Sequence, residues 1–306
     1  MSYLKSTFNV CILEMSEDVN ITAKDIYQKL VENRFRELTP AQEFGHGFID
    51  IKDIFKTNFE FADSIGDKCI YGGYRYDKKM VPNVLVKKLY LEKLREKKSQ
   101  GEKLNKVDKK ILKEECKAQL IMKAFPKPNL ISWIWDLSNY KLYLDTKNIK
   151  VIDNFLALFS DAFDNIPLTL FNMGLEEDQL ENFLEWLWKK LEKKEKDFEI
   201  DDDIILDTGD KTLFKFNGPT LELYLSEIES IKNSKSFKKL STTMLIDEDA
   251  YRISFNSKNL ILTVKLVEKI KHESVETAIL DNLDRIQQIQ EKIKTFVTDF
   301  LGGINE

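Results

Sequence analysis

The chain has 306 residues, of which 42% are hydrophobic and 32% are charged, and its formal net charge is −5. This composition supplies enough apolar material for a folded core, and no stretch approaches the roughly 20 uncharged apolar residues of a membrane-spanning helix. Only two histidines and three widely separated cysteines occur, which excludes a His-rich metal site and argues against disulfides or a structural zinc. We therefore expect a protein that requires no cofactor and resides in the cytoplasm.

Strands are expected where β-branched and aromatic residues cluster between turn residues, in 6–14, 44–51, 68–76, 130–136, 140–145, 167–171, 212–216, 242–246, 251–255 and 260–264. Helices are expected where helical start signals or a period of 3.6 occur, over 23–32, 82–99, 105–122, 149–162, 177–194 and 273–301. Gly302 and Gly303 are expected to cap the last helix. Because hairpin-like strand pairs dominate and the two element types alternate irregularly, the pattern predicts an α+β fold with antiparallel sheets and flanking helices.

The chain is expected to form three parts. Residues 1–76 and 129–175 make a central α+β domain, residues 77–128 a protruding basic helical hairpin, and residues 176–306 a C-terminal α+β domain. The boundary between the central and C-terminal domains is expected near the charged segment 193–203, whose aspartates are interpreted as a solvated turn.

The expected hairpin is a basic island in an acidic chain. Between Lys78 and Lys127 there are sixteen lysines and arginines and only six acidic residues, whereas the rest of the chain has 31 basic and 46 acidic residues. Cations concentrated on one element suit a protein that binds a polyanion such as a phosphate backbone at a single surface. The alternative from charge alone is a helical hairpin whose lysines only keep it solvated.

A helical projection at about 100° per residue separates the charges of the second helix of the hairpin. Its lysines occupy one arc, and Val107, Ile111, Ala118 and Met122 occupy the opposite side, which we expect to be buried. Because lysine is a point charge without base-reading geometry, binding by these cations is expected to be largely independent of base sequence. The candidate DNA-binding residues of both helices are Lys87, Lys88, Arg95, Lys98, Lys106, Lys109, Lys110, Lys113, Lys117 and Lys123.

The hairpin resembles the most characteristic stretch of the RdgC family of bacterial recombination-associated DNA-binding proteins. The resemblance is carried by Lys79-Met80-Val81-Pro82, Gly101 and the strand ending in Trp135-Asp136. Weaker matches lie at Phe35–Phe48 and in the tail Phe300-Leu301-Gly302-Gly303. The chain departs from the family where Met122-Lys123 stands in place of Pro-Arg, so a bidentate arginine contact is lost.

The resemblance implies a non-catalytic protein whose crescent-shaped protomers form a head-to-head homodimeric ring around double-stranded DNA. It further implies association with the nucleoid, recombinase–DNA complexes as partners, and a part in recombination and replication-fork processing. It assigns Phe125 to one dimer contact. From the residues alone, Phe125 is equally an aromatic side chain that closes the helix end onto the core, or one that stands exposed on a short loop.

Two alternatives remain. A metal-dependent DNA exonuclease would need carboxylates that converge on a divalent ion, and the sequence shows no motif for them. A phage or plasmid factor that shields DNA would use the same basic surface. Trp133 and Trp135 share one face of a predicted strand, where we expect them to pack in the core rather than to stack on bases.

Overall fold

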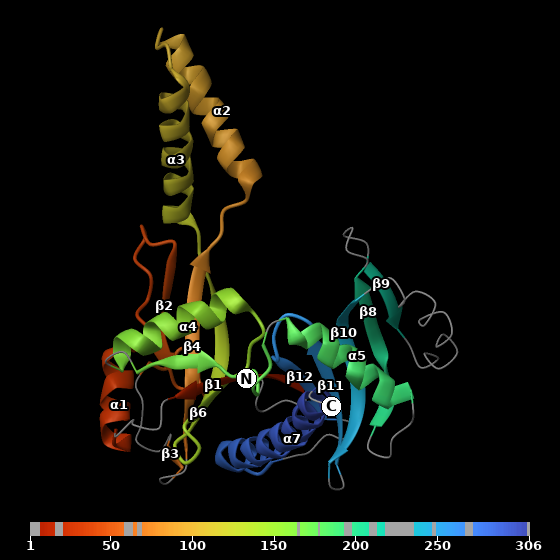
Figure 1. The fold of residues 1–306 in the computed structure, drawn as a ribbon. Helices are drawn as coiled ribbons and strands as arrows, with labels where there is room; N and C mark the ends of the chain where they lie inside the picture. The colour runs from red at the N-terminus through yellow and green to blue at the C-terminus, as the bar shows by residue number, and fades with distance from the viewer. Residues whose placement is uncertain are drawn as a thin grey trace. The chain divides into compact units, whose positions relative to one another are not determined.

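The computed structural model describes residues 7–15, 21–57, 64–65, 69–163, 166–176, 178–192, 198–207, 213–217, 236–246, 249–266 and 272–304. The predicted α+β class is confirmed (Figure 1). The chain divides into two compact units: unit 1 contains Met1–Ile26, Glu60–Gly72 and Ile131–Glu306, and unit 2 contains Tyr27–Phe59 and Gly73–Leu130.

The helices are α1 (Ala23–Glu32), α2 (Asn83–Ser99), α3 (Lys106–Lys123), α4 (Ile149–Ala162), α5 (Gln179–Glu192) and α7 (Val275–Ile304). The strands are β1 (Thr7–Met15), β2 (Phe44–Ile49), β3 (Ser64–Ile65), β4 (Cys69–Lys79), β5 (Pro126–Asp136), β6 (Lys141–Leu144), β7 (Leu168–Leu170), β8 (Phe198–Asp207), β9 (Leu213–Asn217), β10 (Ser236–Ile246), β11 (Asp249–Asn256) and β12 (Leu262–Leu266).

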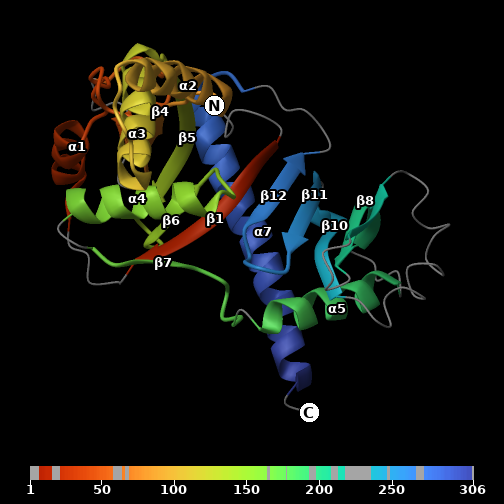
Figure 2. The same ribbon diagram turned by 90° about the horizontal axis from the view of Figure 1, so that it is seen from above.

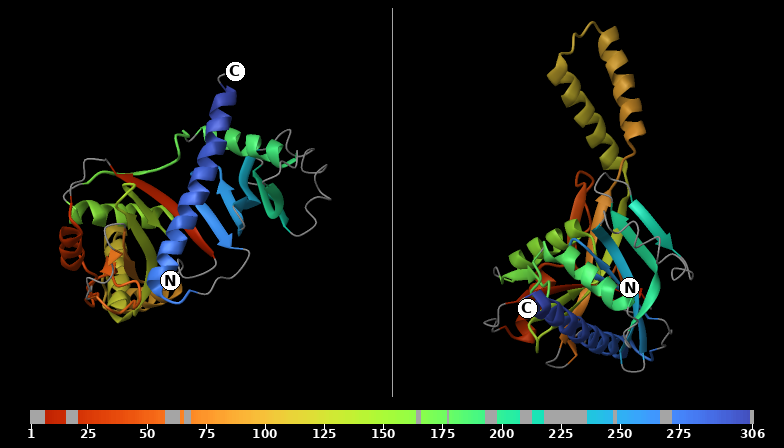
Figure 3. Two further views of the ribbon diagram at one scale, coloured as in Figure 1. Left: turned by 90° about the horizontal axis from the view of Figure 1, so that it is seen from below. Right: turned by 45° about the vertical axis from the view of Figure 1, so that its right-hand side comes forward.

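Unit 1 is built on an antiparallel sheet with the strand order β6-β1-β12-β11-β10-β8-β9. Strand β1 joins its two halves, because Phe8 pairs with Val264 of β12 and Cys11 pairs with Leu144 of β6. The long helix α7 runs alongside this sheet (Figures 2 and 3). The rings of Phe183 and Phe300 lie 5.6 Å apart, which links α5 to α7 in a buried core.

Arg285 of α7 fixes a polar contact at the end of β11. Its guanidinium donates to the Asp249 carboxylate over 2.7 Å and to the Tyr251 hydroxyl over 3.0 Å. Burial, as the main cause, raises the pKa of Tyr251 to about 12. The phenol is therefore neutral at neutral pH and can itself donate to Asp249.

Unit 2 contains the antiparallel pair β2–β4, in which Phe44 lies opposite Lys78 and His46 opposite Tyr76. The alternation in FGHGF gives β2 one aromatic face and one glycine face. The glycine face is needed for a close approach, since a Cβ on Gly47 would lie 2.4 Å from the Phe35 backbone. On this side the buried Arg75 guanidinium bridges Asp77 and Glu37 and lies 4.0 Å from the centre of the Phe35 ring.

The expected elements agree with the structure most closely where local signals are strong. Helix α4 spans the predicted residues, α2 begins one residue later than predicted, and α3 begins and ends one residue later than predicted. Two predictions are wrong. Asp201, Asp202 and Asp203, which we expected in a solvated turn, lie in strand β8, which pairs with β10. Helix α7 runs through Gly302 and Gly303 to Ile304 instead of ending before them. The proposed three-part division and the crescent shape stay predictions. In the part of the chain that the structure describes, no helix is both long and apolar enough to cross a membrane.

Candidate nucleic-acid interface

The basic region forms two helices of unit 2, α2 and α3, which lie side by side and are joined by residues 100–105 (Figure 1). Val86 of α2 and Leu112 and Cys116 of α3 are buried in this pair. Burial is the main cause that raises the pKa of the Cys116 thiol, so this side chain behaves as a small apolar residue.

Local signals explain where both helices begin and end. The Asn105 side chain accepts hydrogen bonds from the backbone N–H groups of Val107 and Asp108, and the Asp108 carboxylate accepts one from the Asn105 N–H. This reciprocal capping box fixes the start of α3. Gly101 has a φ of +80°, a conformation that glycine adopts without strain, and it lets the chain turn after α2.

The apolar side of α3 predicted to be buried is instead exposed. Val107, Ile111 and Met122 expose 64%, 53% and 51% of their surface, and Ala118 is exposed as well. The buried positions Leu112 and Cys116 project in another direction, about 130° away around the helix. The set Val107, Ile111, Ala118 and Met122 is therefore an unpartnered surface in the described structure, and we call it the apolar stripe.

Helix α3 consequently has three faces. Five lysines fall on an arc centred about 90° from the packed positions, on the side away from the apolar stripe. These lysines are Lys106, Lys109, Lys110, Lys113 and Lys117. Because α2 runs antiparallel to α3, helical geometry places Lys87 and Lys98 on the same side of the pair. We call these seven cations the lysine face.

The opposite side of the pair is acidic. Helical geometry places Glu92 and Glu96 of α2 there, together with Asp108 and Glu115 of α3. Lys88 and Arg95 project from the side of α2 that is turned away from α3, and Lys123 is exposed at the last residue of α3. The helix pair thus separates its charges, so that a polyanion is attracted to one side and repelled from the other.

Most of the candidate cations are available to a ligand. Lys117 is half-buried and forms an ion pair with Glu43, with Nζ 3.1 Å from Oε2. In the part of the chain that the structure describes, the other nine candidates are exposed and none of them forms an ion pair. Lys97, which was not a candidate, is neutralised by Glu102 at 2.8 Å, and this hydrogen bond is the main cause that raises its pKa.

Among the residues that the structure describes, Phe125 has the most exposed aromatic side chain, with 91% of its surface accessible. It lies between the end of α3 and the start of β5, so it does not close the helix onto the core. Phe125 follows Met122, the last residue of the apolar stripe, by three positions in the chain. Exposed apolar surfaces of this kind are typical of contacts with another protein.

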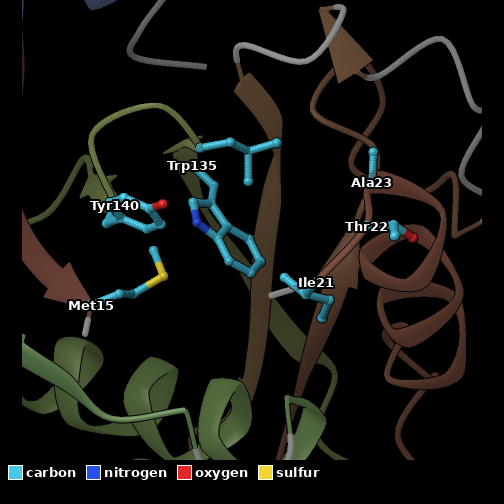
Figure 4. A pocket seen from close by; sticks show the side chains of 7 residues that line it. Met15, Ile21, Thr22, Ala23, Trp135 and Tyr140 are labelled. Atoms are coloured by element: carbon cyan, nitrogen blue, oxygen red, sulfur yellow. The ribbon is translucent and has the colours of Figure 1, made fainter. Parts of the chain in front are cut away.

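A separate pocket of about 320 Å³ lies in unit 1 and is lined by Met15, Ile21, Thr22, Ala23, Trp135, Leu137 and Tyr140 (Figure 4). Sequence reasoning did not find it, because its walls come from three separate segments. No charged side chain is among these described lining residues. Trp133 and Trp135 are 1% and 2% exposed, as expected for core residues.

Among the described residues, no group of three His, Cys, Asp or Glu side chains is placed to hold a metal ion.

Comparison with known families gives one match that covers most of the chain. The family model described as "Putative exonuclease, RdgC" matches residues 8–291. A search of the curated proteins finds no match.

Proposed function

Because the chain belongs to the RdgC family, we propose that it is a non-catalytic protein that binds double-stranded DNA largely independently of sequence. The observation that carries this proposal is the lysine face of α2 and α3, whose cations are exposed on one side while carboxylates gather on the other. Lysine-only recognition supplies affinity for the phosphate backbone without reading base edges.

The dimensions of α3 fit such a role. From Lys106 to Lys117 the helix rises about 16 Å, which matches the axial rise of about five base pairs. Lysines within one arc over this length can follow a single phosphate strand. Each phosphate that they neutralise adds about 0.9 to the slope of log affinity against log salt.

We further propose that the protein is a homodimer whose two copies surround the DNA. The apolar stripe supports this, because Val107 and Met122 are equally distant from the centre of α3, as are Ile111 and Ala118. A surface with this symmetry is complementary to its own copy in an antiparallel arrangement, as a two-fold interface requires. Phe125 is the proposed anchor, since its ring is exposed beside the stripe. Association with the nucleoid and modulation of recombinase–DNA complexes are proposed on the family relationship alone.

The test is binding of a labelled 40-base-pair duplex, measured by fluorescence anisotropy across a salt series. Changing Lys109, Lys110, Lys113 and Lys117 to Glu should weaken binding more than 100-fold and lower the salt slope. The matched control reverses four exposed lysines of unit 1, Lys147, Lys150, Lys258 and Lys294, with the same change in net charge. Equal losses in both variants, or normal affinity in the first, would contradict the assigned surface.

The family description also names an exonuclease, which makes nuclease activity the second candidate. A linear duplex labelled at its 5′ end, incubated with the protein and Mg²⁺, should stay intact under our proposal. Progressive shortening of the duplex would instead establish the nuclease if EDTA abolishes it and if the activity co-purifies with the protein through two columns.

A further inference from the structure

A row of aromatic rings crosses the β2–β4 pair at the base of the lysine face. The row consists of Phe44, His46, Tyr74 and Tyr76, and all four side chains lie on the face of the pair opposite Gly45 and Gly47. Successive ring centres are 5.3 Å apart from Phe44 to His46, 5.8 Å from His46 to Tyr74 and 5.8 Å from Tyr74 to Tyr76.

The row is held rigidly at Tyr74, one of its two inner members. Tyr74 is fully buried, and burial is the main cause that raises its pKa, so its hydroxyl stays protonated. The hydroxyl and Nδ1 of His46 share a hydrogen bond over 2.8 Å. This hydrogen bond orients the imidazole between the rings of Phe44 and Tyr74.

At its two ends, Phe44 and Tyr76, the row becomes accessible. Phe44 exposes 37% of its surface, and Tyr76 is partly exposed, in contrast to the buried Tyr74. The backbone oxygen of Tyr76 accepts a hydrogen bond from the Asn129 side chain, which secures this part of β4. The accessible rings therefore stand on a fixed two-strand support, and a ligand would not have to order them.

Cations border the Phe44 end of the row. Lys78 lies directly opposite Phe44 in the antiparallel register, and its side chain is exposed. On the other side, Lys117 of α3 contacts Glu43, the residue before Phe44. Lys117, the last cation of the lysine face along α3, thus reaches the residue that precedes Phe44 in the chain.

Rings beside a phosphate-binding surface suit unpaired nucleotides. Every base has a π face that stacks on an aromatic side chain, and lysines can hold the connecting phosphates. In a duplex the base faces are covered by neighbouring pairs, so a stacking site can act only on a single strand. We propose that Phe44 and Tyr76 form a stacking site for single-stranded DNA at the base of the lysine face. This inference rests on the proposed function, because the same lysines would supply the phosphate contacts.

The experiment compares labelled dT20 with a blunt 20-base-pair duplex, using the full chain and fluorescence anisotropy at one salt concentration. Phe44→Leu keeps an apolar side chain but removes the π face, and it should weaken dT20 binding roughly 5- to 150-fold, the range for one stacked base. Duplex affinity should change less than two-fold. Phe44→Trp should retain dT20 binding, and Tyr76→Leu should lower it as Phe44→Leu does. Phe55→Leu is the matched control, since Phe55 is 71% exposed in unit 2 but outside the row.

Affinity of Phe44→Leu and Tyr76→Leu for dT20 within two-fold of the parent would overturn the inference, as would an equal loss on dT20 and duplex. The variant with four reversed lysines separates this result from the proposed function. If that variant keeps duplex affinity while Phe44→Leu loses dT20 affinity, the proposed duplex surface fails and the stacking site stands. If the variant with four reversed lysines loses duplex affinity while Phe44→Leu keeps dT20 affinity, the duplex surface is retained and the stacking site is rejected.

Discussion

The ammonium of Lys117 lies 3.1 Å from Oε2 of Glu43, and this contact joins α3 to the start of β2. Both side chains are close to half exposed, so the pair contributes only about 0–1 kcal/mol to folding stability. Its larger consequence is electrostatic, because Glu43 neutralises one cation of the lysine face.

Replacing that carboxylate should therefore strengthen DNA binding. We expect Glu43→Gln to tighten duplex binding about two- to five-fold at low salt, since a surface pair of this kind is worth about 1 kcal/mol or less. The gain should fade as salt increases. Glu96→Gln, on the acidic side of the helix pair, is the control and should have little effect. A weaker complex with Glu43→Gln would show that Glu43 positions Lys117 rather than competing for it.

Phe125→Ala should impair dimerisation without unfolding the protein. Because 91% of Phe125 is exposed, its removal should change the free energy of unfolding of the protomer by less than about 0.5 kcal/mol. An anchor residue typically contributes about 2 kcal/mol or more to association, which predicts at least a 30-fold weaker dimer. Sedimentation velocity over a concentration series measures this change. An unaltered profile would remove Phe125 from the interface.

Glu114 and Glu115 flank the centre of the apolar stripe, where an antiparallel two-fold contact would bring each near its own copy. Like charges at that point oppose association. Glu114→Gln combined with Glu115→Gln should therefore strengthen dimerisation, most clearly at low salt. Lys93→Gln with Lys97→Gln tests whether any change of charge on the helix pair has this effect. Weaker dimerisation of the double glutamine variant would place the interface elsewhere.

The orientation of α3 can be tested by comparing adjacent residues. Leu112 is 3% exposed and Ile111 is 53% exposed. Leu112→Ala should lower the free energy of unfolding of unit 2 by about 2–5 kcal/mol, as buried leucine truncations do. Ile111→Ala should lower it by less than about 1 kcal/mol. Urea denaturation, monitored by hydrogen exchange of the α3 amides, distinguishes the two variants. A larger loss of stability in Ile111→Ala than in Leu112→Ala would indicate that the side predicted from the helical projection is the buried one.

Alkaline pH should destabilise the core of unit 1 through Tyr251. Its pKa is about 12 in the folded protein and about 10 in an unfolded chain. Between these values the unfolded state binds fewer protons, so stability is complete below pH 10 and falls as the pH rises toward 12. Urea midpoints at pH 9, 10 and 11 should decrease less steeply for Tyr251→Phe than for the parent. Parallel slopes would show that Tyr251 does not contribute to the transition.

Much of the secondary structure followed from local signals. Pro82 and Gly101 bracket α2, and Asn105 with Asp108 begins α3, because capping and turn residues act within a few positions. The aspartates Asp201, Asp202 and Asp203 predicted a solvated turn because such residues favour solvent, whereas pairing with β10 makes this segment a strand. Gly302 and Gly303 suggested a helix end, but a glycine is only a local tendency to end a helix, and α7 continues through both residues to Ile304.

The candidate site was only partly accessible to sequence reasoning. The periodicity of α3 separated its lysines correctly, because charge segregation around a helix depends only on spacing. It could not show which of two apolar directions meets α2, since Ile111 and Leu112 are equally apolar neighbours. The aromatic row was invisible for a different reason: Phe44 and Tyr76 are 32 positions apart and meet only through the register of β2 and β4.

The amino-acid sequence by itself determined the α+β class, the basic helices, the family and the candidate cations, because these follow from composition, spacing and ordered motifs. Only the tertiary structure decided that Val107 and Ile111 face outward, that Phe125 is exposed and that Lys117 lies beside Glu43. These outcomes depend on which surfaces pack together, and packing is settled by the free energy of the whole fold rather than by any local segment.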